Sequence, residues 1–422
     1  MVTVCSAMPQ GYPARPGKGR RARRRVPSLP NSVPHLTAAR PLAFLSLAAL
    51  LAAAGCSGGK ETSSVAAGCQ GSWALVAGPS GGKGLFDVEA FAPNDVWAVG
   101  EHAGSAATGA LAEHWDGKNW AGVPGPAPGS DAGSLSAVAG VSTDDVWAVG
   151  YVSAGDAGED TPLVQHWDGS AWELSPVPAA AVGIDLTDVS VASSDDAWAV
   201  GASPAQRGRS RDIVLHWDGS AWQVAPSPEG EKGLLGVTAA AADDVWAVGF
   251  SVDATTQETR TLVQHWDGSA WQLVPAPSPG SLSVLYRVEA IAADDVWAVG
   301  SSSGDGPGAA LIEHWDGSSW EVIQGPVAAS ALISVAAAAT DDVWSVGYGG
   351  GGALIARWDG KAWDVVDGAP AHGALEGGRD SAGRPGVGRR RGRLRAAQSP
   401  ILLRRVRARF RSGGPAQLRD ES

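Results

Sequence analysis

Short apolar runs alternate with turn residues through most of the chain. Between Leu285 and Ala290 apolar and polar residues alternate, which is typical of a β-strand with one buried face. An Asp-containing turn follows, and three more apolar runs occupy residues 296–300, 310–315 and 319–323. This stretch therefore predicts four short strands that pair in antiparallel order.

The same pattern occurs six times. Each unit carries Asp-Val-Trp-Ala-Val-Gly or a close variant, followed by His-Trp-Asp-Gly-x-x-Trp, with Arg357 replacing the histidine in the sixth copy. Four antiparallel strands recurring every 40 to 50 residues or so are typical of a β-propeller blade. The first tryptophan of each unit recurs at intervals of 47 to 51 residues, at Trp97, Trp147, Trp198, Trp246, Trp297 and Trp344.

Eighteen of the 19 tryptophans belong to these units, and the other is Trp73. Residues 71–76 match the fourth strand of a unit although they precede the first one, and such a strand can complete the last blade of a ring. We therefore predict an all-β propeller over residues 71–377. It comprises a closing strand at 71–78, six four-stranded antiparallel blades from about 85 to 368, and an incomplete seventh blade. A six-bladed ring and an open β-solenoid are the alternatives.

The repeated residues are expected to have structural roles. The leading tryptophans should pack as wedges between blades, with platforms for sugar rings as the alternative. The paired Asp residues and the Asp of each Trp-Asp-Gly should cap backbone N–H groups in turns, with Ca²⁺ binding as the alternative. In the fifth unit, Asp316-Gly317 predicts a two-residue type I′ hairpin.

Five units place a histidine before Trp-Asp-Gly. Identical positions in successive blades are spread around a ring, so these side chains cannot converge on one metal ion, and each should hydrogen-bond a neighbouring strand or turn. We predict no catalytic residue, no metal site and no cofactor. The histidines are His114, His166, His216, His265 and His314.

The N-terminal region is typical of an export signal. Residues 41–54 are apolar and follow the basic cluster 20–25, and the run ends in Ala-Ala-Gly-Cys56, which resembles a bacterial lipobox. We expect residues 1–56 to be a signal peptide whose Cys56 is lipidated, followed by a linker at 57–70. The start codon could lie further downstream. The expected location is the outer membrane or cell surface, with a secreted or periplasmic protein as the alternative.

Charge divides the chain into three zones. Residues 57–375 carry 11 Lys and Arg against 40 Asp and Glu, so the body repels nucleic acid. Residues 378–422 are Arg-rich and contain no tryptophan. Codons for Val387 to Arg390 can encode Trp-Ala-Val-Gly in another frame, so we interpret this tail as a disordered, frameshifted seventh blade. A genuine basic tail that binds acidic lipid or polymer is the alternative.

The units resemble bacterial surface lipoproteins built from Kelch-like or Asp-box-like propeller repeats, over residues 72–377. Here Asp and Gly are adjacent, whereas the Asp-box separates them by one residue, and the Kelch double glycine is missing. The resemblance therefore implies the architecture more than a particular function.

Function is expected on the face that varies between units. The two short hairpin turns of each unit are nearly constant and share one face, whereas the loops between second and third strands, with the blade linkers, vary on the other. We predict a monomeric, non-catalytic module that binds a protein, glycan or envelope component there. A carbohydrate-active enzyme, of sialidase or lyase type, is the alternative. The candidate residues are Asp156, Glu159, Asp160, Arg207, Arg209, Arg211, Glu258 and Arg260.

Overall fold

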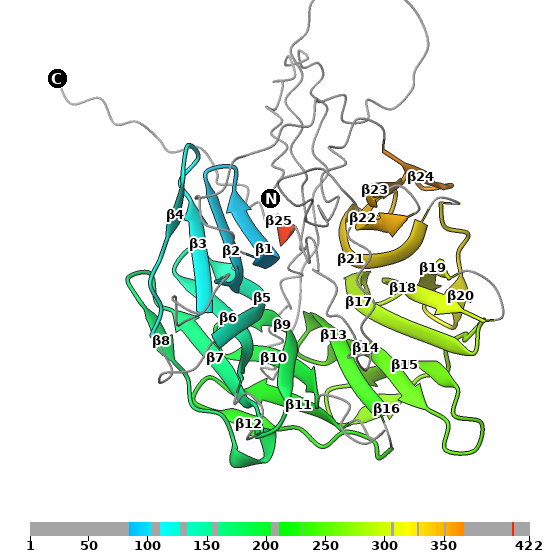
Figure 1. The fold of residues 1–422 in the computed structure, drawn as a ribbon, viewed down its shortest axis with the longest axis horizontal. Coiled ribbons are helices and arrows are strands. Elements are labelled where there is room, and N and C mark those ends of the chain that lie inside the picture. Colours follow the sequence, from blue (N-terminus) through cyan, green and yellow to red (C-terminus); the bar gives the residue numbers. More distant parts are fainter. Residues whose placement is uncertain are drawn as a thin grey trace, which may run out of the picture.

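The computed structural model describes residues 84–102, 110–126, 133–153, 159–203, 211–230, 232–304, 308–326, 329–349 and 352–366, and the backbone of 407–408. Within these residues, six four-stranded meanders follow one another, and we number them as blades 1 to 6 (Figure 1). Trp73, Cys56 and the predicted seventh blade lie outside the described residues.

The strand bounds are as follows. Blade 1 is β1 (Gly84–Ala92), β2 (Asp95–Glu101), β3 (Ala110–Trp115) and β4 (Trp120–Gly122). Blade 2 is β5 (Gly133–Ser142), β6 (Asp145–Val152), β7 (Thr161–Trp167) and β8 (Trp172–Leu174). Blade 3 is β9 (Asp185–Ser193), β10 (Asp196–Ala202), β11 (Asp212–Trp217) and β12 (Trp222–Val224). Blade 4 is β13 (Lys232–Ala241), β14 (Asp244–Val252), β15 (Thr259–Trp266) and β16 (Trp271–Leu273). Blade 5 is β17 (Leu282–Ala292), β18 (Asp295–Ser303), β19 (Ala309–Trp315) and β20 (Trp320–Val322). Blade 6 is β21 (Ala329–Ala339), β22 (Asp342–Gly349), β23 (Gly352–Trp358) and β24 (Trp363–Val365). A short 3-10 helix (Ala179–Ala181) lies in the linker to blade 3, and β25 (Arg407–Ala408) pairs in parallel with β1.

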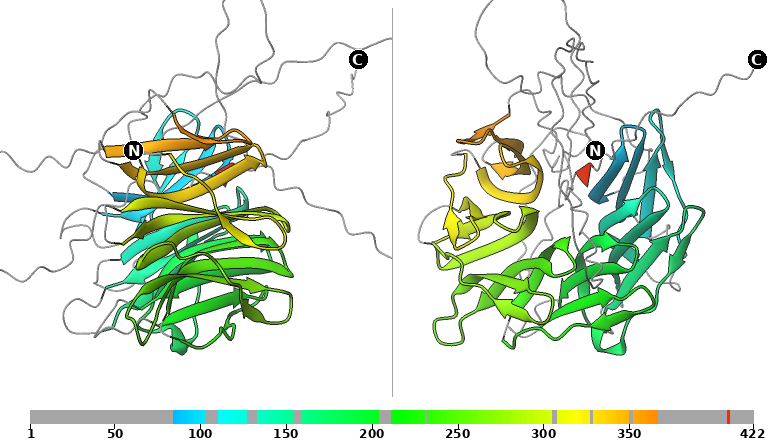
Figure 2. Two further views of the ribbon diagram at one scale, coloured as in Figure 1. Left: turned by 90° about the vertical axis from the view of Figure 1, so that its right-hand side faces the viewer. Right: turned by 180° about the vertical axis from the view of Figure 1, so that it is seen from behind.

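The blades follow one another around a common axis, which confirms the predicted all-β propeller architecture. Within each blade the strands pair antiparallel in chain order, and the first strand of each blade packs against the first strand of the next. Blades 1 and 6 stand at the two ends of the described arc, and the turned views show neighbouring blades face to face (Figures 1 and 2). Blades 4 and 5 form one continuous sheet, because Thr259 of β15 pairs with Leu282 of β17.

The glycine that ends each Trp-Ala-Val-Gly motif is required by a close approach of two strands. In blade 5 the register of β17 shifts between Leu285 and Arg287, and a Cβ added to Gly300 would lie 1.9 Å from the carbonyl oxygen of Val284. The same shift occurs at the corresponding place in the other five blades of the described chain. Only glycine fits beside this bulge, which curves the inner strand of the blade.

The hydrophobic core lies between blades as well as within them. Trp97 of blade 1 has its ring centroid 4.9 Å from that of Trp167 and 5.1 Å from that of Trp172, both in blade 2. We call this contact between two neighbouring blades a joint. At four further joints, the leading tryptophan of one blade again makes a near-perpendicular contact with the outer-strand tryptophan of the next blade. The leading tryptophans of all six blades are buried, and those of blades 1 to 5 pack as wedges against the next blade, as the repeat predicts.

The Asp-Gly turn is not the type I′ hairpin that the sequence predicts. In blade 5, Trp315 pairs directly with Trp320, so the loop has four residues, and only Gly317 has a positive φ, of 91°. Asp316 instead accepts hydrogen bonds from the backbone N–H groups of Ser318 and Ser319, at 2.8 and 2.9 Å. The prediction was wrong because this side-chain cap favours a longer loop in which one residue needs the left-handed conformation.

Candidate functional site

Each histidine of the repeat makes a structural contact within its own blade, on the face formed by the constant turns. In blade 1 the Nε2 of His114 lies 2.7 Å from the Oδ1 of Asp95, and its ring lies 4.7 Å from that of Trp97. Blades 2 to 5 repeat the His–Asp pair at 2.8 to 2.9 Å. The predicted hydrogen-bonding role of these imidazoles is therefore confirmed.

Blade 6 replaces the imidazole with a guanidinium that makes the same contacts. The Nε of Arg357 donates to the Oδ1 of Asp342 at 2.7 Å, and its Cζ lies 5.3 Å from the ring centre of Trp344. A guanidinium can replace imidazole here because both are planar donors that stack on an indole. The second Asp of each pair thus binds this side chain, where the sequence had predicted a backbone cap.

The Asp of each Trp-Asp-Gly turn is a cap, as predicted. In blade 2, Asp168 accepts from the hydroxyl and N–H of Ser170 and from the N–H of Ala171. These donors lower the pKa of Asp168 to about 2. Trp167 of the same turn donates its indole N–H to the carbonyl oxygen of Thr143 in the other turn, at 3.2 Å. The turn carboxylate of Asp168 and the indole N–H of Trp167 are therefore engaged within the fold.

The loops between second and third strands meet the blade linkers, which places both on the opposite face. The carbonyl oxygen of Asp160 in blade 2 accepts from the N–H of Gly183 in the following linker, at 2.8 Å. Arg211 of blade 3 donates to the carbonyl oxygen of Val182 in that linker, at 2.9 Å. Thr261 of blade 4 donates to the carbonyl oxygen of Pro277 in the next linker, at 2.7 Å. We call this the variable face.

The candidate residues do not gather at one point on the variable face. Glu159, Asp160 and Arg211 lie where blades 2 and 3 meet. Glu258 and Arg260 form an exposed ion pair of 2.8 Å on blade 4. The remaining candidates, Asp156, Arg207 and Arg209, lie outside the described residues.

A pair of carboxyl groups on the variable face was not predicted from the sequence. Asp185 begins β9, where its side chain hydrogen-bonds that of Asp160, the residue before β7. Burial raises the pKa of Asp185 to about 7, and the charge of Asp160 and the shared hydrogen bond add to the rise. The pKa of Tyr151 is raised by burial and then by the charges of Asp185, Glu101 and Asp160. The sequence feature that could have indicated this pair is that Asp185 is the one acidic residue at its position among the six blades.

Charged side chains on the inner strands are used to join blades. Arg287 of blade 5 lies 3.8 Å from Asp188 of blade 3 and donates to the carbonyl oxygen of Thr187 at 3.2 Å and to that of Leu235. Asp188 also accepts from the N–H of Val237 in blade 4. These contacts link three blades across their inner strands and stabilise the arrangement.

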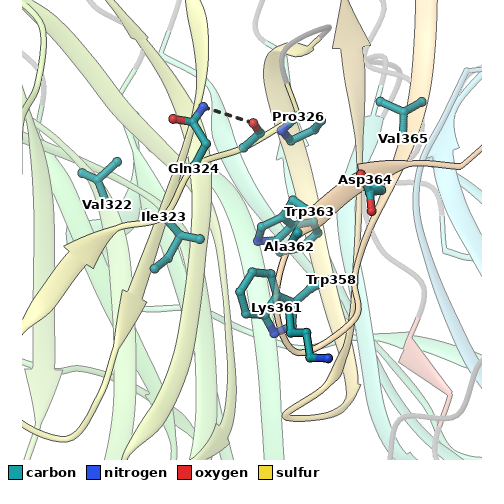
Figure 3. A pocket seen from close by; sticks show the side chains of 11 residues that line it. Val322, Ile323, Gln324, Pro326, Trp358, Lys361, Ala362, Trp363, Asp364 and Val365 are labelled. Atoms are coloured by element: carbon teal, nitrogen blue, oxygen red, sulfur yellow. Dashed lines mark hydrogen bonds between the residues drawn. The ribbon is translucent and has the colours of Figure 1, made fainter. Parts of the chain in front are cut away.

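An open groove lies on the outer side between blades 5 and 6 (Figure 3). Its volume is about 650 Å³. One wall is the end of β20 with the linker that follows, and the other is β24 with its preceding turn and Trp358 of β23. The residues that line it are Val322, Ile323, Gln324, Gly325, Pro326, Trp358, Lys361, Ala362, Trp363, Asp364 and Val365.

Comparisons with known proteins show a likeness of fold. No family model matches the chain, and no curated protein matches it. The solved structure of YCF48 bound to D1 peptide is 16% identical, with a TM-score of 0.44 over 67% of this chain and 82% of the other. YCF48 from Cyanidioschyzon merolae is 14% identical, with a TM-score of 0.44 over 70% of this chain and 88% of the other. A GH74 xyloglucanase from Xanthomonas campestris is 11% identical, with a TM-score of 0.34 over 67% of this chain and 60% of the other.

The chain is thus an all-β protein made of tryptophan-rich, four-stranded propeller blades. Among the described residues, no group of three or more His, Cys, Asp or Glu side chains is placed to hold a metal ion. In the same residues, no helix has the length and apolar character needed to span a membrane.

Proposed function

We propose that this protein is a non-catalytic binding module that engages a protein or glycan through the variable face. The carrying observation is the contrast between the two faces. The constant turns repeat one set of internal hydrogen bonds in blade after blade, whereas the loops and linkers opposite differ in length, charge and contacts. A rigid scaffold that presents variable loops is the usual arrangement of a binding surface.

The test compares the two faces. The full-length chain is labelled and applied to isolated bacterial envelopes and to a glycan array. Variants Arg211→Ala and Arg260→Ala alter the variable face, and Lys118→Ser alters an exposed residue of a constant turn as the control. We expect at least one variable-face variant to reduce binding several-fold and the control to leave it unchanged. Equal loss in the control, or binding that neither face affects, would refute the assignment.

The same proposal places the module at the cell surface through a lipid on Cys56. The support is the apolar run that ends in Ala-Ala-Gly-Cys56. Incorporation of labelled palmitate into the chain, lost in Cys56→Ser, would support this anchor. An unlabelled chain released into the medium would instead favour an ordinary secreted protein.

A specific observation favours carbohydrate-active chemistry as a second candidate. Asp160 and Asp185 share a hydrogen bond, and the pKa of Asp185 is about 7, so one carboxyl group can hold a proton near neutral pH while the other is ionised. Such a pair, with Tyr151 beside it, can donate and accept a proton near neutral pH, as general acid–base cleavage of a polysaccharide requires. Release of reducing ends from a polysaccharide panel, lost in Asp185→Asn and retained in Glu258→Gln, would favour this candidate over binding alone.

A further inference from the structure

The groove between blades 5 and 6 occurs where the chain departs from its own repeat. After the outer strand, four linkers carry a Pro-x-Pro sequence that begins at Pro124, Pro176, Pro226 or Pro275. The linker from blade 5 to blade 6 carries Gln324-Gly325-Pro326 instead. The first residue of the pair of prolines is thus replaced by a flexible amide side chain at the edge of the groove.

The facing turn of blade 6 lacks the serine of blades 2 to 5 and has a lysine, as the turn of blade 1 has at Lys118. Blades 2 to 5 have serine after Trp-Asp-Gly, and in each the hydroxyl donates to the Asp of the turn, as Ser318 does to Asp316 at 2.7 Å. Blade 6 has Lys361, whose backbone N–H still donates to Asp359 at 2.9 Å while its side chain lines the groove. The turn keeps its cap, and the groove gains an ammonium group.

The lining combines apolar surface with a few polar groups of mixed character. Trp358 is half-buried and provides indole surface, and the exposed side chains of Val322 and Val365 extend it, whereas Trp363 lines the groove but is only 5% exposed. Gln324, Lys361 and Asp364 stand at the rim, and the last two carry opposite charges. Such a lining suits a ligand that has apolar faces, carries many donors and acceptors, and has no net charge.

We propose that this groove binds a neutral oligosaccharide. The C–H face of a sugar ring can lie against indole, and its hydroxyl groups can donate to Asp364, accept from Lys361 and do both with Gln324. An anionic glycan would gain from Lys361 but be repelled by Asp364. A groove of about 650 Å³ lies within the range of small-ligand sites, roughly 300–1,000 Å³. The site is on the outer side of blades 5 and 6, so this proposal is independent of the proposed binding by the variable face.

The test restores the repeat at this one joint. Gln324→Pro installs the proline of the linkers that follow blades 1 to 4, and Lys361→Ser installs the serine of the turns of blades 2 to 5, so the double variant should fold. Binding of the full-length chain is measured by calorimetry against neutral oligosaccharides (glucan, mannan, xylan and galactan series) and against oligogalacturonate. We expect a neutral series to bind, and the double variant to lose at least ten-fold in affinity at unchanged melting temperature.

The matched control is Ser318→Lys, which places a lysine in the corresponding turn of blade 5. It should leave the affinity unchanged. The proposal is overturned if no neutral series binds, if oligogalacturonate binds more tightly than every neutral series, or if the double variant binds as the parent does. Preferential binding of an apolar, Pro-rich peptide to the parent, lost in the double variant, would overturn it in favour of a peptide groove.

Discussion

Trp297 of blade 5 meets Trp363 of blade 6 edge to face, with ring centroids 5.6 Å apart and ring planes at 73°. Five such joints connect the six described blades, and each buries the leading tryptophan of one blade against the outer-strand tryptophan of the next. The same edge-to-face pair of tryptophans therefore recurs at each joint around the axis.

Truncation of a leading tryptophan should weaken the whole arc. Trp297 is 2% exposed, so Trp297→Ala removes a large buried ring and leaves a cavity. We expect a loss of about 3–5 kcal/mol in the free energy of unfolding. Urea denaturation followed by circular dichroism measures it. Val365→Ala, at an exposed side chain of the next blade, should cost far less, and an equal loss in both variants would contradict the wedge role.

The histidine position of the repeat should tolerate arginine but not alanine. Arg357 contacts Asp342 and Trp344 in the way that His314 contacts Asp295 and Trp297. His314→Ala should destabilise the fold by about 1–3 kcal/mol, because Asp295 loses a charge-assisted partner. His314→Arg should recover most of that loss. The melting temperatures of both variants test this prediction. If the arginine variant is no more stable than the alanine variant, blades 5 and 6 are not equivalent at this position.

The blade pattern could be predicted from the sequence because each strand has a local signature and the signature is repeated. The tryptophan wedges and the Asp caps follow from the same repetition. The hairpin type at Asp316-Gly317 could not be predicted from the sequence, because it depends on a side-chain cap that competes with the two-residue turn. The Asp160–Asp185 pair and the groove beside Gln324 arise between different blades, so their neighbours appear only when the blades are packed together.

The turn Asp residues should set the acid limit of stability. The pKa values of Asp168, Asp267 and Asp316 are lowered to about 2, chiefly by a serine hydroxyl and by backbone N–H groups. A lowered folded-state pKa means stability that is present above the ordinary value of 3.8 and is lost as the pH falls towards 2. The triple variant with Asn at these positions should show a flatter decline in melting temperature between pH 4 and pH 2. An unchanged acid limb would mean that other carboxylates control acid unfolding.

A buried glutamate should have the opposite effect at alkaline pH. Glu313 of β19 is fully buried, neither of its carboxyl oxygens has a hydrogen-bond partner among the described residues, and burial raises its pKa to about 8. Stability from the protonated acid is therefore complete below the ordinary value of 4.5 and is lost as the pH rises through 8. Blades 2 and 4 carry Gln165 and Gln264 at this position, and Gln165 donates to the carbonyl oxygen of Pro126 at 3.2 Å.

Glu313→Gln should consequently stabilise the protein where the parent is weakest. A neutral amide already fits this site in two blades, so we expect a gain of about 1–3 kcal/mol at pH 9 and little change at pH 5. Melting temperatures of parent and variant measured from pH 5 to pH 9 give the difference. Glu321→Gln, at an exposed residue of β20, controls for the change in net charge. If the two variants respond alike, the pH dependence comes from the overall charge of the acidic body and not from the burial of Glu313.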